Sequence, residues 1–224
     1  MTRAALLACA AIACGGATAA AQGNTPTGRV EVGGGVAWIG QASLGSSDAT
    51  ESTASGPPST IFRTSSNLSS AGGWGVHVNV RVTSRLEVTG GAGFTRPTIR
   101  TEISNDIETS AAVTATERVD QYTFSAGALW YLPFRRPGSR VYPFLSGSAG
   151  YLRQLHDMNT LAATGQVYQV GGGAKIFFAS RRRSWLKGYG LRGDAGVTAR
   201  TKGVAFDGGT LYSPSFAASL FVRF

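Results

Sequence analysis

The stretch Trp74-Gly75-Val76-His77-Val78-Asn79-Val80-Arg81-Val82 places an apolar residue at every second position and a small or polar residue between each pair. Successive side chains of an extended strand point to opposite faces of a sheet, so this period of two predicts a strand with one apolar and one polar face. A strand of this kind is typical of a sheet that separates two environments of different polarity.

Seven further stretches repeat the pattern, and no comparable stretch shows the 3.6-residue period of a helix. They are residues 30–39, 86–94, 122–132, 141–152, 168–178, 186–198 and 212–224. The sequence therefore predicts an all-β chain of eight antiparallel strands. For 141–152 the pattern leaves open which side chains face inward.

The connections between these strands alternate in length. Short links are expected at 83–85, 133–140 and 181–184, and long links at 41–71, 96–118, 156–166 and 199–210. This alternation, with strands of about ten to twelve residues, is the layout of a transmembrane β-barrel. We predict an eight-stranded antiparallel up-and-down transmembrane β-barrel with short periplasmic turns and long extracellular loops.

Aromatic residues near the strand ends support this prediction. Membrane barrels carry a girdle of aromatic residues at each interface, whereas a soluble β core would gather them near strand middles. One group adjoins the long links and consists of Trp38, Trp74, Phe94, Tyr122, Tyr151, Tyr168 and Tyr212. The other group lies at the opposite strand ends and consists of Trp130, Phe178, Trp185 and Phe224.

The first 21 residues have the layout of a secretory signal peptide. Arg3 supplies a positive charge, residues 4–13 form a short apolar core, and Ala19-Ala20-Ala21 ends the segment with small residues. We expect cleavage after Ala21, with Ala19 as a second possible site and a lipoprotein site at Cys14 as another alternative. The expected domains are a signal peptide at 1–21, which removes both Cys residues, and a barrel at 22–224.

Composition excludes several classes of protein. The 224 residues are 42% hydrophobic and 15% charged, which rules out a disordered polyelectrolyte and a large multidomain assembly. The net charge of +9 invites a nucleic-acid hypothesis. We expect no nucleic-acid partner, because the chain is exported and its arginines gather in the short links, as at Arg85, Arg140 and 181–183.

The last strand ends in a terminal Phe preceded by apolar residues at alternate positions: Phe216, Leu220, Val222 and Phe224. This ending resembles the C-terminal assembly signal of bacterial outer-membrane proteins. With the signal peptide and eight strands, the chain resembles the small outer-membrane β-barrel group that includes the OmpA membrane domain, OmpX and the opacity proteins. The resemblance implies a bacterial outer-membrane location with periplasmic termini, and outer-membrane lipid and the outer-membrane assembly machinery as partners.

The inward faces of the predicted strands carry a set of ionisable residues. An eight-stranded barrel is only wide enough for its own side chains, and a buried charge is costly unless it is paired. If 83–85 is a three-residue turn, Arg81 lies opposite Glu87. We expect a polar network that closes the lumen, formed by Glu31, His77, Arg81, Glu87, Lys175, Arg192, Asp194 and Arg223.

These features favour a structural or surface-interaction role with an unknown extracellular ligand. Two alternatives stay open: a small-solute or ion pore, for which inward glycines leave room, and a lipid-modifying outer-membrane enzyme. An enzyme would need a Ser or Cys nucleophile beside a His base, and neither His77 nor His156 lies in a recognisable motif of that kind. We therefore expect no catalytic residues, no metal and no cofactor.

Overall fold

The computed structural model describes residues 28–51, 59–104, 113–133, 139–156, 162–180, 185–201 and 209–224. The predicted signal peptide, its alternative cleavage sites and both Cys residues lie outside these ranges. No helix in the described ranges is long and apolar enough to cross a membrane.

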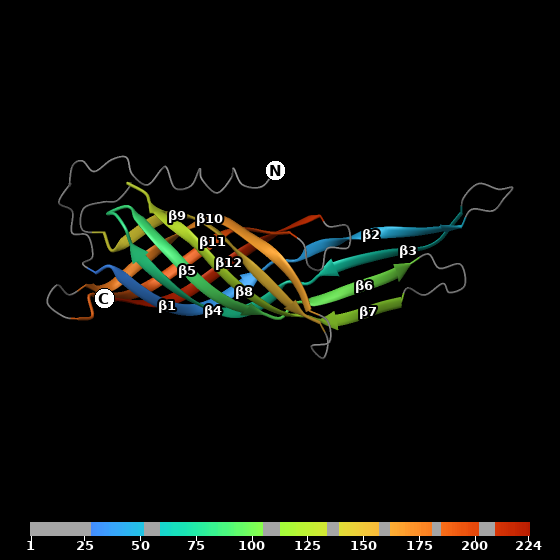
Figure 1. Cartoon of the computed structure of the whole chain (residues 1–224), viewed down its shortest axis with the longest axis horizontal. Helices are drawn as coiled ribbons and strands as arrows, with labels where there is room; N and C mark the ends of the chain where they lie inside the picture. The colour runs from blue at the N-terminus through green and yellow to red at the C-terminus, as the bar shows by residue number, and fades with distance from the viewer. Residues whose placement is uncertain are drawn as a thin grey trace.

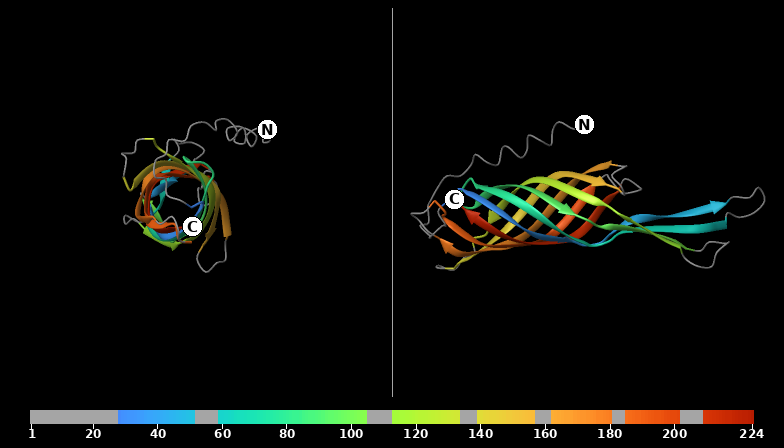
Figure 2. Two further views of the ribbon diagram at one scale, coloured as in Figure 1. Left: turned by 90° about the vertical axis from the view of Figure 1, so that its left-hand side faces the viewer. Right: turned by 90° about the horizontal axis from the view of Figure 1, so that it is seen from below.

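Eight strands form a closed antiparallel barrel, in the order β1-β12-β11-β10-β9-β8-β5-β4 (Figures 1 and 2). Each barrel strand pairs with the next barrel strand along the chain, and the last strand, β12, closes the ring by pairing with β1. The predicted fold class is confirmed. The strands are β1 (Val30–Ile39), β4 (Ala71–Arg81), β5 (Leu86–Thr95), β8 (Asp120–Tyr131), β9 (Val141–Leu155), β10 (Ala162–Ser180), β11 (Gly188–Thr201) and β12 (Thr210–Arg223).

Four further strands form a second sheet, in the order β2-β3-β6-β7, that extends the molecule beyond one end of the barrel (Figures 1 and 2). We call this end the sheet end, and the opposite end, where β1 begins and β12 finishes, the terminal end. The strands are β2 (Ala42–Glu51), β3 (Ser59–Leu68), β6 (Thr98–Ser104) and β7 (Val113–Arg118).

The second sheet corrects the expectation that 41–71 and 96–118 are simply long links. Only Gly40 and Gln41 separate β1 from β2, and only Arg96 and Pro97 separate β5 from β6. The β1–β4 and β5–β8 strand pairs therefore continue past the barrel after a short break. The sequence did not reveal these strands because their Ser- and Thr-rich composition lacks the apolar alternation of a membrane strand.

An apolar cluster lies at the junction between the barrel and the second sheet. Its buried members come from β2, β3 and β6 and from the residue between β7 and β8, and Leu211, from β12, packs against them. We call it the junction cluster: Ala42, Leu44, Leu68, Ile99 and Val119.

The outer surface of the barrel is apolar. Side chains that would be buried in a soluble protein are exposed here, among them Val36, Val170 and Leu220, each more than 60% exposed. An apolar band of this extent marks a surface that contacts lipid. On β9, whose facing the sequence left open, Leu145 and Tyr151 belong to this outer surface, while Phe144 is buried in the lumen.

Aromatic rings border the band at both ends. At the sheet end the ring of Phe94 lies 6.1 Å from that of Trp74 and 5.1 Å from that of Tyr122. At the terminal end Trp185 stacks on Phe224, with 5.4 Å between ring centroids. Each of the two groups expected from the sequence thus contains aromatic rings in contact with one another.

Candidate functional site

The short turn between β4 and β5 sets the register of the lumen at the terminal end. The Val82 amide donates to the Leu86 carbonyl at 3.0 Å, and the Leu86 amide donates to Thr83 Oγ1 at 3.0 Å. Arg81 consequently pairs with Glu87 across the two strands, which confirms the register predicted from a three-residue turn.

Two carboxylates and two cations meet in the lumen at the terminal end, and we call them the ion cluster: Glu31, Glu87, Lys175 and Arg223. Lys175 Nζ donates to Glu31 Oε1 at 2.6 Å and to Glu87 Oε2 at 2.7 Å. Arg223 Nη2 donates to Glu31 Oε2 at 2.6 Å and to Glu87 Oε1 at 2.8 Å. Each carboxylate thus faces both cations, and none of the four side chains is more than 2% exposed.

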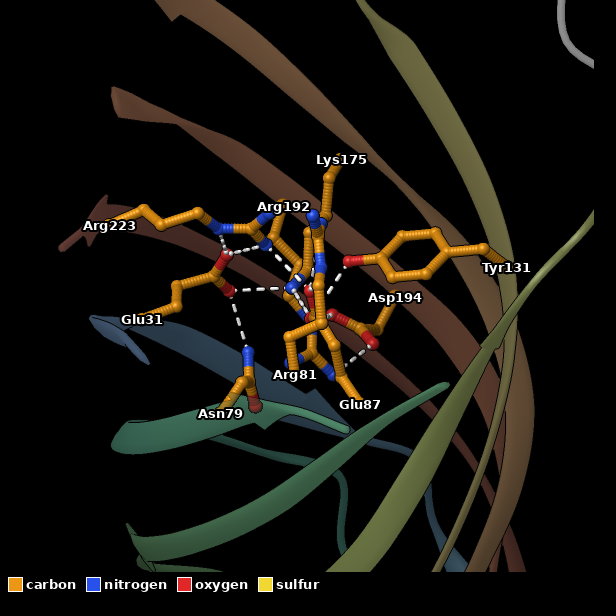
Figure 3. Close-up of polar contacts among 9 residues, drawn as sticks. All are labelled: Glu31, Asn79, Arg81, Glu87, Tyr131, Lys175, Arg192, Asp194 and Arg223. Atoms are coloured by element: carbon orange, nitrogen blue, oxygen red, sulfur yellow. Dashed lines mark hydrogen bonds and ion pairs between the residues drawn. The ribbon is translucent and has the colours of Figure 1, made fainter. Parts of the chain in front are cut away.

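Three neighbouring side chains complete this arrangement (Figure 3). Asn79 Nδ2 donates to Glu31 Oε1 at 2.6 Å, and the Tyr131 hydroxyl donates to Glu87 Oε2 at 2.8 Å. Arg81 lies at the edge of the cluster, with its Nη2 3.3 Å from Glu87 Oε1. Because the carboxylates are bonded from several directions, the desolvation cost of burying them is offset by hydrogen bonds as well as by opposite charge.

Aromatic rings from four strands fill the space around the ion cluster. They contact one another edge to face in a series, with centroids 5.0 to 6.3 Å apart. Lys175 Nζ lies 5.5 Å from the centroid of Phe221, and Arg223 Cζ lies 4.9 Å from that of Phe177, which adds cation–π attraction. The rings and the ion cluster together form the plug: the five rings are Tyr131, Tyr142, Phe144, Phe177 and Phe221.

Inward glycines make room for these rings. A Cβ atom at Gly190 would lie 2.8 Å from the Phe221 ring, and one at Gly173 would lie 2.8 Å from the Phe144 ring. A Cβ at Gly173 would also meet the backbone carbonyl of Gly193 on the adjacent strand. These two glycines thus relieve crowding inside the barrel wall and leave no free space for water at their positions.

The remaining predicted lumen residues lie farther toward the sheet end. Arg192 and Asp194 form a two-bond ion pair, with contacts of 2.7 and 2.8 Å, and the guanidinium of Arg192 lies over the Phe144 ring. His77 pairs in register with Gly33 and Gly91, and its Nε2 is buried without a hydrogen-bond partner. The structure therefore separates the predicted network into the ion cluster with Arg81 and a second group consisting of Arg192, Asp194 and His77.

A cavity of about 230 Å³ occupies the lumen on the sheet-end side of the plug. We call it the chamber. Its lining includes Thr95, Gln121, Gln169, Thr198 and Arg200, so it is rich in polar side chains, and its volume is many times the ~10–15 Å³ that a single water needs. The two halves of the lumen thus differ: the terminal half is filled, and the sheet half is hollow.

The four residues proposed as an assembly signal lie on the outer face of β12 and at its end. Phe216, Leu220 and Val222 are exposed to the lipid side. The carbonyl of Phe224 accepts a hydrogen bond from the Arg29 amide at 2.9 Å, and the Phe224 amide donates to the Val30 carbonyl at 2.8 Å. The C-terminus therefore takes part in closing the barrel, while its role in assembly stays a prediction.

Some lumen residues did not enter the predicted network. Tyr131 and Phe177 follow outward-facing Trp130 and Ile176, so the period of two assigns them to the lumen, but apolar side chains there gave no polar signal. Arg200 lies two residues beyond the predicted end of its strand, and it has the same inward parity as Arg192. Extending the predicted strand by two residues would have placed Arg200 among the lumen residues.

No three His, Cys, Asp or Glu side chains in the described ranges gather closely enough to hold a metal ion.

A closed eight-stranded barrel with an apolar outer band and a polar, charged lumen defines the class of small membrane β-barrels. The alternation of side chains along each strand produces both features: inward residues form the charged lumen, and outward residues form the apolar band.

The family model for the outer membrane protein β-barrel domain matches residues 7–224, and the chain belongs to this family. The protein is accordingly an outer-membrane β-barrel of bacterial type. No curated protein matches the chain.

Two solved structures are similar to the chain over most of its length. Neisserial surface protein A (NspA) is 14% identical, with a TM-score of 0.47 over 87% of this chain and 97% of that one. The outer membrane protein OprG from Pseudomonas aeruginosa is 10% identical, with a TM-score of 0.47 over 89% of this chain and 97% of that one.

Proposed function

We propose that the protein is a closed barrel with a structural or surface-interaction role, which holds the β2-β3-β6-β7 sheet outside the cell. The observation that carries this proposal is the plug. Lys175 is fully buried and bonded to both carboxylates, and Phe144 is 1% exposed beside it. A lumen filled in this way offers no path for solute, so the surface outside the membrane is the part available for function.

The proposed orientation has the terminal end in the periplasm. Short turns face the periplasm and longer connections face outward in barrels of this class. The β4–β5 turn spans only four residues, Val82 to Arg85, whereas the second sheet extends from the other end. Arg85 and Arg140 lie beside the short links, where a cation can contact anionic headgroups of the inner leaflet.

The second sheet supplies a surface suited to contact with an extracellular partner. Its outer residues include Phe62, 37% exposed, and Val113, 56% exposed, among many hydroxyl side chains. The junction cluster fixes the base of the sheet to the barrel. A paired sheet presents such residues with less ordering cost on binding than an irregular loop would. The ligand itself, the lipid contacts and the assembly machinery remain proposed partners.

Cysteine labelling tests the orientation. Thr116→Cys places a thiol on exposed β7, and Ser84→Cys places one in the exposed β4–β5 turn as the matched control. A membrane-impermeant maleimide applied to intact cells should label only the first variant, and both should label after permeabilisation. Labelling of Ser84→Cys alone in intact cells would reverse the orientation.

Removal of the second sheet tests the role. Replacing residues 42–70 and 97–119 by short turns keeps all eight barrel strands, so the variant should insert and retain the heat-modifiable gel mobility of a folded barrel. Whole cells that display the full chain should bind at least one member of a panel of glycans and matrix proteins, and cells with the variant should not. Equal binding by cells with the full chain and cells with the variant would show that the second sheet is not the binding surface.

A pore is the second candidate function, and the chamber favours it. The chamber lining includes many polar side chains and follows β11 from Asp194 to Arg200. Conduction would require the ion cluster to open, because it blocks the lumen below the chamber. A conductance recording of the refolded protein in a planar bilayer separates this candidate from the closed barrel.

We propose no catalytic activity. Where the structure describes the chain, His156 Nδ1 contacts Glu117 Oε1 at 2.7 Å, and neither His77 nor His156 is hydrogen-bonded to a Ser. A nucleophile activated by a His base needs that contact. Mass analysis of lipid A from cells with and without the protein tests this: identical lipid is expected, and a modified species would establish an enzyme.

A further inference from the structure

The chamber contains a buried cation that has no partner. Arg200 is only 4% exposed, its Nη1 is buried without a hydrogen-bond acceptor, and it forms no ion pair with any described residue. Its register neighbours are Val167 and Leu211, which are apolar. Leaving a guanidinium desolvated and unpaired is costly, so this position calls for a compensating negative group.

The other unpartnered groups of the chamber are also nitrogens. They are His77 Nε2, Gln121 Nε2 and Arg192 Nη1, and each of these residues lines the chamber with Arg200. Unpartnered oxygens occur on Asn79, Gln154, Thr201 and Ser213, and none of these four residues is part of the lining. Arg192 Nη1 and Arg200 Nη1 are hydrogen-bond donors, whereas His77 Nε2 donates or accepts according to its tautomer, and Gln121 lies opposite Gln154 with its unpartnered Oε1.

The carboxylates of the lumen are already paired with cations other than Arg200. Among the described residues that face the lumen, the carboxylates are Glu31, Glu87 and Asp194, and each already contacts at least one cation. Asp194 uses both oxygens on Arg192. Arg200 thus has no carboxylate left to pair with, and the chamber carries a net positive charge.

We propose that the chamber is a binding site for a small oxyanion, a phosphate, sulfate or carboxylate group held by Arg200. A guanidinium presents its N–H groups in a planar fork that matches two oxygens of such an anion. The volume of about 230 Å³ accommodates a small oxyanion together with waters. This site is independent of the second sheet and of the proposed surface role.

The side chains at the sheet end of the chamber are poorly accessible to solvent. Gln121 and Arg200, at the sheet end of the lumen, are 1% and 4% exposed, so bulk solvent reaches them poorly. An anion present while the barrel closes is therefore enclosed more readily than one added afterwards. The test accordingly compares protein refolded with and without the anion.

The experiment refolds the full mature chain in detergent with inorganic phosphate or with chloride at the same ionic strength, and measures the thermal midpoint. Phosphate should raise the midpoint of the unmodified protein, and Arg200→Met should abolish that rise. Arg200→Lys should retain part of it. Arg63→Met, on the exposed sheet, serves as the control and should behave as the unmodified protein does.

Arg200→Met should also melt no lower than the unmodified protein in chloride, because it removes an uncompensated buried charge. A phosphate effect that is absent from the unmodified protein, or equal in Arg200→Met, would overturn the proposal. If that variant does not fold, crystals of the unmodified protein grown with selenate decide the matter. An anomalous peak within hydrogen-bond distance of Arg200 Nη1 supports the site, and a chamber without one overturns it.

Discussion

The two halves of the lumen are built from the same strands, but their buried charges differ in how they are paired. In the plug, Lys175 and Arg223 each contact both Glu31 and Glu87, and aromatic rings fill the remaining space. In the chamber, the buried Arg200 has no partner among the described residues, and a cavity adjoins it. We infer from this difference that the plug closes the lumen, while the chamber has room for another group.

The largest effect is expected from Lys175→Met. This change leaves Glu31 and Glu87 with Arg223 as their shared close cation, and breaking a buried ion pair costs about 3–5 kcal/mol. Urea unfolding of barrel refolded in lipid vesicles measures the loss. Arg85→Met, in the exposed β4–β5 turn, is the control and should change little. A loss for Lys175→Met as small as that of the control would mean that the plug does not stabilise the barrel.

Glycine substitutions compare the packing of the two halves. Gly173→Ala puts a Cβ against the Gly193 carbonyl and the Phe144 ring in the filled half, and should cost about 1–3 kcal/mol. Gly93→Ala, beside the chamber, meets only the Trp74 carbonyl at 3.7 Å and should stabilise by about 0.4–1 kcal/mol through the unfolded state. The same unfolding assay reads both variants, and equal losses would contradict a hollow sheet half.

The Arg81–Glu87 contact should contribute less than the ion cluster. Glu87 keeps Lys175, Arg223 and Tyr131 when Arg81 is replaced, and the Arg81 contact is long at 3.3 Å. A double-mutant cycle with Arg81→Met and Glu87→Gln should give a coupling of about 1 kcal/mol or less, with the double variant losing less than the sum. Strictly additive losses would show that the two side chains do not interact.

The smallest effect is expected on the exposed second sheet. Arg63 donates to Asp48 at 2.7 and 2.9 Å, and this hydrogen bond holds the pKa of Asp48 below its ordinary value. A lowered folded-state pKa gives stability above the ordinary pKa of Asp that is lost as pH falls through the lowered value. Solvent screens this exposed pair, so Asp48→Asn should leave the thermal midpoint unchanged at pH 7. A loss of stability as large as that of Lys175→Met would show that solvent exposure does not weaken the contribution of an ion pair to stability.

The alternation of side chains made much of the architecture predictable from sequence. It gave the eight barrel strands, and the three-residue turn gave the register of Arg81 and Glu87. The second sheet was missed because its strands have no buried face of alternating apolar residues along their length. The partners within the lumen were also missed, because pairing Lys175 with Glu31 depends on the closure and shear of the barrel, which bring together residues 144 positions apart.

Conductance of the refolded barrel in a planar bilayer tests the closed lumen most directly. The unmodified protein should insert without producing steady current steps, since the plug fills the terminal half of the lumen. Lys175→Met, inserted to the same level as judged by gel mobility, provides the comparison in which the ion cluster is broken. Stable, long-lived current steps from the unmodified protein would contradict the account and establish a pore.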